Sequence, residues 1–198
     1  MQIDSILHRT GLQNFTVVKE NDEYNFKIVV CETSDGQKLL ITDGLRNRNQ
    51  AVNKNNADLI NIELYMAFPK YWNLSERNWP IEWLNRIAQV PQKNDTWFGV
   101  GDTIPAGNPP EELDPKFKAN HFVLSRPISH RDLFPIEETH SSGVQMLAVI
   151  PIFQQEMDYK LKNSHTMLFN KMAKKGVTEQ VDLFRENTCK VRFFGMFG

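Results

Sequence analysis

The run VQMLAVIPIF, residues 144–153, is the most apolar stretch of this 198-residue chain. Its length and its valine and isoleucine content are typical of a strand that is buried on both faces in the middle of a sheet. The run is also far shorter than the roughly 20 residues that are needed to cross a bilayer. It therefore predicts a central strand, around which the other elements can be placed.

Other strands are predicted where β-branched and aromatic segments are separated by turn-forming residues. Near the N-terminus, three such segments predict an antiparallel meander of residues 15–18, 24–31 and 38–42. Residues 59–68 predict a second central strand, which Pro69 ends because proline cannot donate a hydrogen bond to a neighbouring strand. The remaining predicted strands are residues 121–126 and, at an edge of the sheet, residues 191–197.

A helix is predicted at residues 80–90. Proline suits the first helical turn, where Trp79-Pro80 places it, and one apolar face of the segment includes Leu84 and Ile87. Further helices follow from apolar periodicity and from glycines at helix ends. They span the first dozen residues up to Gly11, residues 155–162, residues 164–175 up to Gly176, and a short stretch at 178–185.

Two long stretches are predicted to be loops. Residues 45–58 are rich in asparagine and have no apolar period, and residues 97–120 carry glycines and prolines at a density that regular structure does not tolerate. A loop as long as the second is often functional. The order of the elements predicts an α/β (α+β) fold, with a mixed, largely antiparallel β-sheet flanked by α-helices, in a single domain spanning residues 1–198.

Charge and hydropathy argue against two classes of partner. The 23 lysines and arginines nearly balance 24 aspartates and glutamates, so no overall field attracts nucleic acid. No apolar run suits a membrane, and Asp4 and His8 interrupt any secretory leader. Cys31 lies in an apolar run far from Cys189, which predicts a free, buried thiol. We expect a cytoplasmic protein that binds neither nucleic acid nor membrane.

The catalytic motifs in the sequence are incomplete. His130-Arg131-Asp132 is similar to the catalytic loop of protein kinases, but Glu137 stands where that loop needs a metal-binding asparagine. Gly99-Val100-Gly101 lacks the third glycine of a dinucleotide-binding motif, and the five histidines show no zinc-site spacing. The sequence therefore predicts no enzyme, no cofactor and no metal.

A general acid/base site stays open as an alternative, because carboxylates that are distant in sequence can meet in a folded chain. The candidates for such a site are Glu63, Asp95, Asp102, Glu156 and His121. A deep cleft around a carboxyl group with a strongly shifted pKa would favour this alternative. A shallow surface with an aromatic rim would favour binding instead.

Four tryptophans crowd into one quarter of the chain, at positions 72, 79, 83 and 97. Such a cluster is more often core than surface. The alternative is a protein-binding face, because tryptophan and tyrosine are enriched at binding hot spots.

Several segments, taken in order, resemble the suppressor-of-fused domain family over roughly residues 25–175. They are Thr42-Asp43-Gly44, Ile62-Glu63-Leu64, Trp79-Pro80, Asp95-Thr96-Trp97, Gly101-Asp102-Thr103-Ile104, and Val149-Ile150-Pro151-Ile152-Phe153 leading into Glu156-Met157-Asp158-Tyr159-Lys160. No single segment is diagnostic. Their order and spacing make the resemblance specific.

This resemblance implies a domain that binds a protein and does not catalyse. Animal members pair the domain with a second one and hold a transcription factor in check, whereas stand-alone bacterial members resemble immunity proteins that neutralise a toxin. The expected partner is therefore a protein, with a toxin favoured over a signalling or transcription factor. The expected contact residues are Asp43, Gly44, Asp95, Trp97, Gly101, Asp102, Thr103 and Tyr159.

Overall fold

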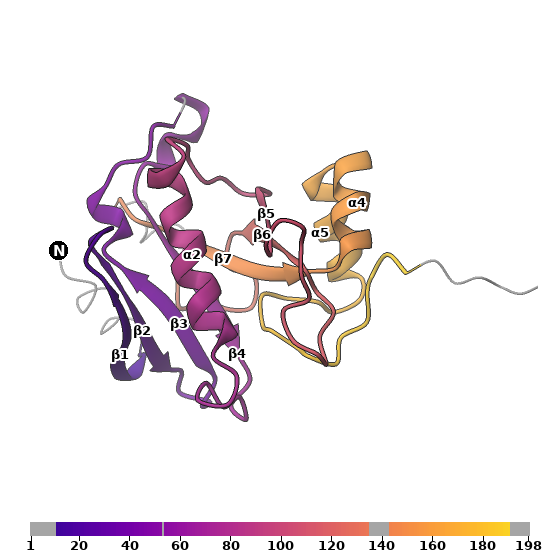
Figure 1. Ribbon diagram of the computed structural model, residues 1–198, viewed down its shortest axis with the longest axis horizontal. Coiled ribbons are helices and arrows are strands. Elements are labelled where there is room, and N and C mark those ends of the chain that lie inside the picture. Colours follow the sequence, from indigo (N-terminus) through magenta and orange to yellow (C-terminus); the bar gives the residue numbers. More distant parts are fainter. Residues whose placement is uncertain (1–10, 53, 135–142, 191–198) are drawn as a thin grey trace, which may run out of the picture.

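Seven strands form one sheet in the computed structural model of the protein, which describes residues 11–52, 54–134 and 143–190. The strand order is β1-β2-β3-β4-β7-β6-β5 (Figure 1). The strands are β1 (Gln13–Asn21), β2 (Phe26–Glu32), β3 (Lys38–Asp43), β4 (Ile62–Phe68), β5 (Thr103–Pro105), β6 (His121–Ser125) and β7 (Gln145–Ile152). Neighbouring strands are antiparallel except for the central β4–β7 pair, which is parallel. The predicted fold class, a mixed and largely antiparallel sheet with helices, is confirmed.

Helices cover both faces of this sheet. They are α2 (Trp79–Lys93), α4 (Gln154–Lys162) and α5 (His165–Ala173), with short 3-10 turns η2 (Leu45–Asn47) and η3 (Lys54–Leu59) between β3 and β4. Figure 1 shows α2 lying across the strands, and α4 and α5 together at the other side of the molecule. None of the helices in the described ranges is long and apolar enough to cross a membrane.

The core consists of two apolar clusters, one on each side of the sheet. Leu84, Ile87 and Ala88 of α2 pack on one face, against side chains such as Leu64 of β4. Leu168 and Met172 of α5 pack on the other face, in the cluster that contains Tyr65 and Ile150. Every residue of β4 and β7 is buried, as the apolar run at 144–153 predicts for a central strand. Full burial of one such aliphatic side chain contributes about 1.5–3 kcal/mol.

The tryptophans belong largely to the core. Trp72 is buried and stacks on Phe68 and Trp79, and Trp83 packs on Phe122. Trp79, Trp83 and Trp97 are partly buried against the α2-side cluster. The favoured interpretation of the tryptophan cluster is therefore confirmed. Cys31 is free and buried as predicted, and burial raises the pKa of its thiol to about 12.

Four element predictions need correction. Helix α2 does not end at residue 90 but continues through Pro91 to Lys93. The proline lies in the last turn, where its missing N–H removes only one helical hydrogen bond. The predicted loop 97–120 contains β5, and the predicted loop 45–58 contains η2 and most of η3. Residues 178–185 are not helical, because they run alongside the end of β4, where Val181 N–H donates to Ala67 O at 2.8 Å.

Three other sequence predictions are not decided by these elements. The helix predicted in the first dozen residues lies almost wholly outside the described residues, and the edge strand predicted at 191–197 lies wholly outside them. The boundaries of the single domain stay a prediction.

Candidate protein-binding surface

The predicted contact residues fall in three places on the fold and do not form one site. Asp43 and Gly44 lie at the end of β3, beside a hollow. Asp95 lies just after α2. The others surround β5: Trp97, Gly101, Asp102, Thr103 and, on α4, Tyr159.

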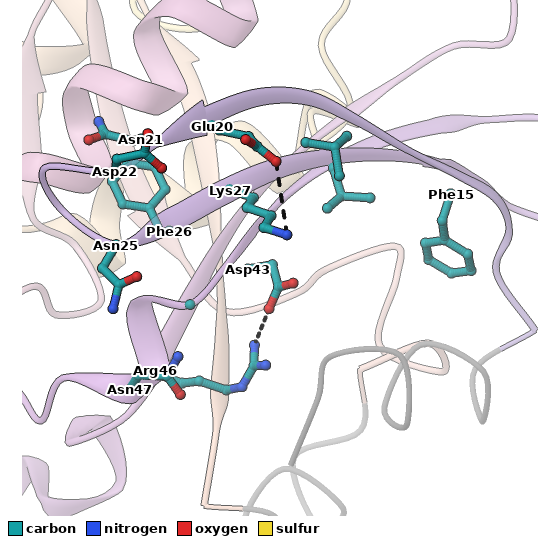
Figure 2. Close-up of a pocket in the computed structure, with 13 residues that line it drawn as sticks. Phe15, Glu20, Asn21, Asp22, Asn25, Phe26, Lys27, Asp43, Arg46 and Asn47 are labelled. Atoms are coloured by element: carbon teal, nitrogen blue, oxygen red, sulfur yellow. Dashed lines mark ion pairs between the residues drawn. The ribbon is translucent and has the colours of Figure 1, made fainter.

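The hollow at the end of β3 has a volume of about 630 Å³. Its lining is mostly polar and comes from β1, the β1–β2 turn, β2 and the segment 43–47. Figure 2 shows Asp43 and Arg46 facing each other, with an ion pair of 2.9 Å between Asp43 Oδ1 and Arg46 Nη1. The same view shows Glu20 and Lys27 paired above them, at 4.0 Å. Four of the charged side chains that line the hollow are thus paired with one another.

Beneath this hollow, the buried side chain of Glu63 holds the chain end of β3. Glu63 Oε1 accepts hydrogen bonds from Gly44 N–H at 2.9 Å and from Arg46 Nη1 at 2.8 Å, and Oε2 accepts from the Thr42 hydroxyl at 2.6 Å. Burial raises the pKa of Glu63 to about 7, although the hydrogen bonds and Arg46 oppose the rise. Gly44 has φ +124°, and a Cβ there would stand 2.8 Å from Asn25 O. Gly44 therefore serves the fold whether or not it contacts a partner.

Asp95 lies at the C-terminal end of α2, in a Schellman turn. Thr96 N–H donates to Pro91 O at 2.9 Å, Asn94 is the C-cap, and Asp95 has φ +47°. A smaller hollow of about 170 Å³ opens beside it. We call this hollow the α2 socket and define it by Leu45, Arg48, Ile62, Ala88, Pro91 and Asp95, which are among its lining residues.

The loop between Asp95 and β5 is shaped by its own side chains. Asp102 Oδ2 accepts from Gly99 N–H at 2.7 Å, and a Cβ on Gly99 would come within 2.7 Å of the Trp97 ring. A Cβ on Gly101 would come within 2.3 Å of His165 on α5. These contacts fix the entry of the chain into β5 and dock it on α5.

Strand β5 is an edge of the sheet. Asp102 O accepts from Leu124 N–H and Ala106 N–H donates to Asn120 O, both at 2.9 Å, so these residues point their backbone groups toward β6. Backbone groups alternate in direction along an antiparallel strand, so those of Thr103 and Pro105 face away from β6. No strand of the described residues pairs with this outer edge.

Helices α4 and α5 border the same edge. Lys160 Nζ donates to the Thr103 hydroxyl at 3.3 Å, and Lys171 Nζ lies 4.4 Å from the centroid of the Tyr159 ring. Leu161 is 67% exposed and Met167 is 49% exposed, which is unusual for large apolar side chains. Thr103 and Tyr159 are both predicted contact residues. They lie near each other, because Lys160, which follows Tyr159 on α4, bonds the Thr103 hydroxyl.

The candidate acid/base residues do not assemble into one site. Within the described ranges, no hydrogen bond or ion pair joins any two of Glu63, Asp95, Asp102, Glu156 and His121. His121 bonds Asn120, and burial lowers the pKa of its imidazole although Asp158 opposes this. No group of metal-ligating side chains occurs in the same ranges.

Glu156 and Glu179 anchor the C-terminal segment. Arg185 grips both oxygens of Glu156 at 2.8 Å, and Thr188 donates to it through its N–H and its hydroxyl. Burial alone would raise the pKa of Glu156, but these bonds hold it below its ordinary value. The carboxylate of Glu156 therefore holds the C-terminal segment in place.

Glu179, which no sequence pattern singles out, binds the loop around the buried side chain of His130. It accepts from the N–H groups of Ile128, Ser129 and His130 at 3.0 Å and from the Tyr65 hydroxyl at 3.1 Å. Its pKa is lowered, because bonds from His130 and the backbone outweigh the effect of burial. Ser129 and Glu179 both approach Nδ1 of His130, so the three do not form a catalytic triad, which uses both ring nitrogens.

Comparison with known proteins decides the family. The family model described as Suppressor of fused protein (SUFU) matches residues 22–186. The chain belongs to the suppressor-of-fused family. No curated protein matches the chain.

Solved structures of the suppressor-of-fused family share the fold. A homologue from Neisseria gonorrhoeae FA 1090 is 17% identical, with 94% of each chain covered and a TM-score of 0.67. A chain of the Sufu–Fu complex is 13% identical, with 94% of this chain and 88% of that one covered and a TM-score of 0.61. Drosophila Suppressor of Fused is 11% identical, with coverage of 89% and 42% and a TM-score of 0.50. At these identities the likeness concerns the fold alone.

Proposed function

We propose that this suppressor-of-fused domain is a non-catalytic binding protein, and that a segment of its partner adds as a strand to the outer edge of β5. The observation that carries the proposal is the orientation of Thr103, whose backbone N–H and C=O face away from the sheet. Strand addition at an exposed edge is a recurrent mode of peptide recognition, in which main-chain hydrogen bonds supply affinity. A related fold has been crystallised as the Sufu–Fu complex.

The two edges of the sheet differ in ways that favour β5. Strand β1 has register shifts at two places, between Gln13 and Thr16 and between Val17 and Lys19, and bulges of this kind protect an edge. Lys19 is also tied to Glu82 of α2 by an ion pair of 2.8 Å. Edge β5 pairs with β6 in a continuous register without such a bulge. A partner strand could therefore extend a regular ladder at β5.

The partner that we favour is a toxin, which makes the domain an immunity protein that acts in the cytoplasm. The support is the resemblance to stand-alone bacterial members of the family. Co-expression with the product of a neighbouring toxin gene tests this part separately. Rescue of growth by the domain is the expected result, and unrelieved killing contradicts the immunity role while leaving protein binding open.

The strand-addition proposal is tested by Thr103→Pro, with Thr103→Val as the matched control. Proline removes the outward N–H without touching a bond to β6, and Pro105 shows that the neighbouring outward position accepts it. The control keeps the N–H but loses the hydroxyl that Lys160 bonds. The partner captured from the native host by the unsubstituted domain is purified, and its affinity for each variant is measured by calorimetry.

The expected result is at least a 10-fold loss of affinity for Thr103→Pro and a small change for Thr103→Val. The size follows from the loss of a backbone hydrogen bond together with a clash of the ring with the incoming strand. Equal affinity of Thr103→Pro and the unsubstituted domain contradicts strand addition at β5.

A further inference from the structure

The α2 socket has an apolar floor and a polar mouth. Leu45, Ile62 and Ala88 in its floor are all buried, and Ala88 is 1% exposed. Arg48 and Asp95 at the mouth are exposed. An apolar cavity of about 150 Å³ admits benzene. A socket of about 170 Å³ therefore has room for one phenyl or isobutyl group.

The walls of the socket are held in place by Gln50. Its side-chain amide donates to Leu59 O at 2.7 Å and accepts from Phe98 N–H at 2.7 Å. These bonds tie the segment after η2 to the loop that leads from Asp95 to β5. The socket is thus preformed, and the loop of residues 96–102 connects it to the proposed docking edge.

Aspartate at position 95 makes the fold less stable than glycine or asparagine would. The C′ position of a Schellman turn has positive φ, and glycine or asparagine is the usual residue there. A carboxylate at this end also faces the negative pole of the helix dipole of α2. Residues that are unfavourable for the fold cluster at functional sites. No ion pair of the described residues compensates the charge of Asp95.

Arg48, from the segment after η2, meets the last turn of α2 at the mouth. Its guanidinium donates to the neutral amide of Gln92 at 2.7 Å, and that bond leaves its charge uncompensated. The mouth therefore offers one strong acceptor, Asp95, and one strong donor, Arg48. An extended peptide carries both a backbone N–H and a C=O beside each side chain, which is the complementary set.

We propose that the α2 socket receives one apolar side chain of the partner polypeptide, aromatic or leucine-like, while Asp95 and Arg48 bond the peptide backbone at its mouth. This inference rests on the proposed function and adds a second contact to it. The loop of residues 96–102 joins the two contacts along the chain. Desolvated pockets that hold one large side chain are typical of binding hot spots.

The socket is tested with a defined probe, N-acetyl-phenylalaninamide, titrated into the isotope-labelled domain. Saturable shifts of the methyl signals of Leu45, Ile62 and Ala88 are expected, with a dissociation constant on the order of 1 mM for a ligand of this size. N-acetyl-glycinamide, which lacks the side chain, is the matched control compound. The absence of saturable shifts for the phenylalanine compound overturns the proposal.

Two variants examine the floor and the mouth separately. Ala88→Leu fills the floor and is expected to abolish the shifts. Asp95→Gly suits the turn, keeps the fold, and is expected to weaken the probe roughly 3- to 10-fold through the lost hydrogen bond. Unchanged affinity in Asp95→Gly overturns the role of the mouth, even if Ala88→Leu fails to fold.

A third arm separates a polypeptide group from a free small molecule. Toluene carries the ring without the amides, and it is expected to bind more weakly than the probe and to be indifferent to Asp95→Gly. Toluene that binds as well as the probe overturns the assignment to a polypeptide. Thr103→Pro should bind the probe normally, so a failure of strand addition at β5 can be recognised independently of the socket.

Discussion

Glu63 and Glu156 are both buried carboxylates with an arginine partner, yet burial raises the pKa of Glu63 to about 7 while the pKa of Glu156 stays below its ordinary value. The difference lies in the donors. Both oxygens of Glu156 face the Arg185 guanidinium and a backbone N–H, which cannot reverse their polarity. Among described residues, Oε2 of Glu63 has one donor, the hydroxyl of Thr42, which can turn and accept instead.

The contrast shows that an arginine neighbour alone does not decide the charge of a buried acid. What matters is whether the protein offers fixed donors to both oxygens. The donors around Glu156 stabilise its ionised form, and their bonds hold the C-terminal segment against α4. Glu63 is close to the balance between its two forms, and it supports the segment next to the hollow at the end of β3.

The largest effect is expected for Glu156→Gln, which should lower the free energy of unfolding by roughly 3–5 kcal/mol, the usual range for breaking a buried ion pair. In either orientation, the new amide NH₂ would face a guanidinium and a backbone N–H. Urea denaturation measures the change. Glu186→Gln is the control, because it removes the same charge from an exposed position in the same segment and should change stability by less than about 0.5 kcal/mol. Similar values for both variants would contradict the contrast.

A smaller effect is expected from pH acting on Glu63. Its pKa is about 7 in the folded protein against an ordinary 4.5, so the contribution of Glu63 to stability is greatest below pH 4.5 and is lost as pH rises to about 7. Glu63→Gln should lack this loss, because the amide can replace the protonated carboxyl. The difference in unfolding free energy between Glu63→Gln and the unsubstituted protein should therefore change by about 1–3 kcal/mol between pH 4.5 and 7.5.

This comparison cancels other titrating groups, such as His121, because they are common to both proteins. Parallel stability curves for the two proteins would show that Glu63 is ionised throughout this range.

Asp102→Ala should cost about 1–2 kcal/mol, because it leaves Gly99 N–H without its acceptor. Asp102→Asn, which keeps a carbonyl oxygen, should cost less. If the loop is contact surface, affinity for the partner should fall by more than this stability loss. Equal losses of stability and affinity would show that Asp102 acts only on the shape of the loop.

The smallest effect has the opposite sign. Asp95→Gly should stabilise the domain by roughly 0.5–1 kcal/mol, because glycine accepts positive φ and removes a carboxylate from the helix C-terminus. Asp95→Asn tolerates the same backbone without the charge, so it isolates the dipole contribution. Thermal unfolding of the three proteins measures both parts. Destabilisation by glycine would mean that Asp95 makes a favourable contact with the fold.

Much of the fold was predictable, because apolar patterns extend over whole elements. The apolar run at 144–153 predicts β7, the β-branched and aromatic segment at 24–31 predicts β2, and Trp79-Pro80 marks the start of α2. Strand β5 was missed because it is three residues long and is defined by pairing with β6, not by its own composition. The helix predicted at 178–185 failed because Glu179 and Arg185 are engaged by residues far away in sequence.

The site was predictable only in part, for the same physical reason. Sequence resemblance selects Asp95 and Thr103 but cannot say that they lie in different places on the fold. The acid/base alternative names Glu63 and Asp102, whose bonds serve the fold. The α2 socket has no sequence signal, because it arises where the end of α2 meets the segment after η2.

The most direct test of the central claim is hydrogen exchange at the Thr103 amide, measured for the domain alone and with its captured partner. Rapid exchange is expected in the free domain, because this N–H faces away from the sheet and pairs with no strand of the described residues. The account predicts slowing by at least about 10-fold in the complex, with the amides of β1 unchanged. Protection that appears along β1 while Thr103 continues to exchange rapidly would contradict the account.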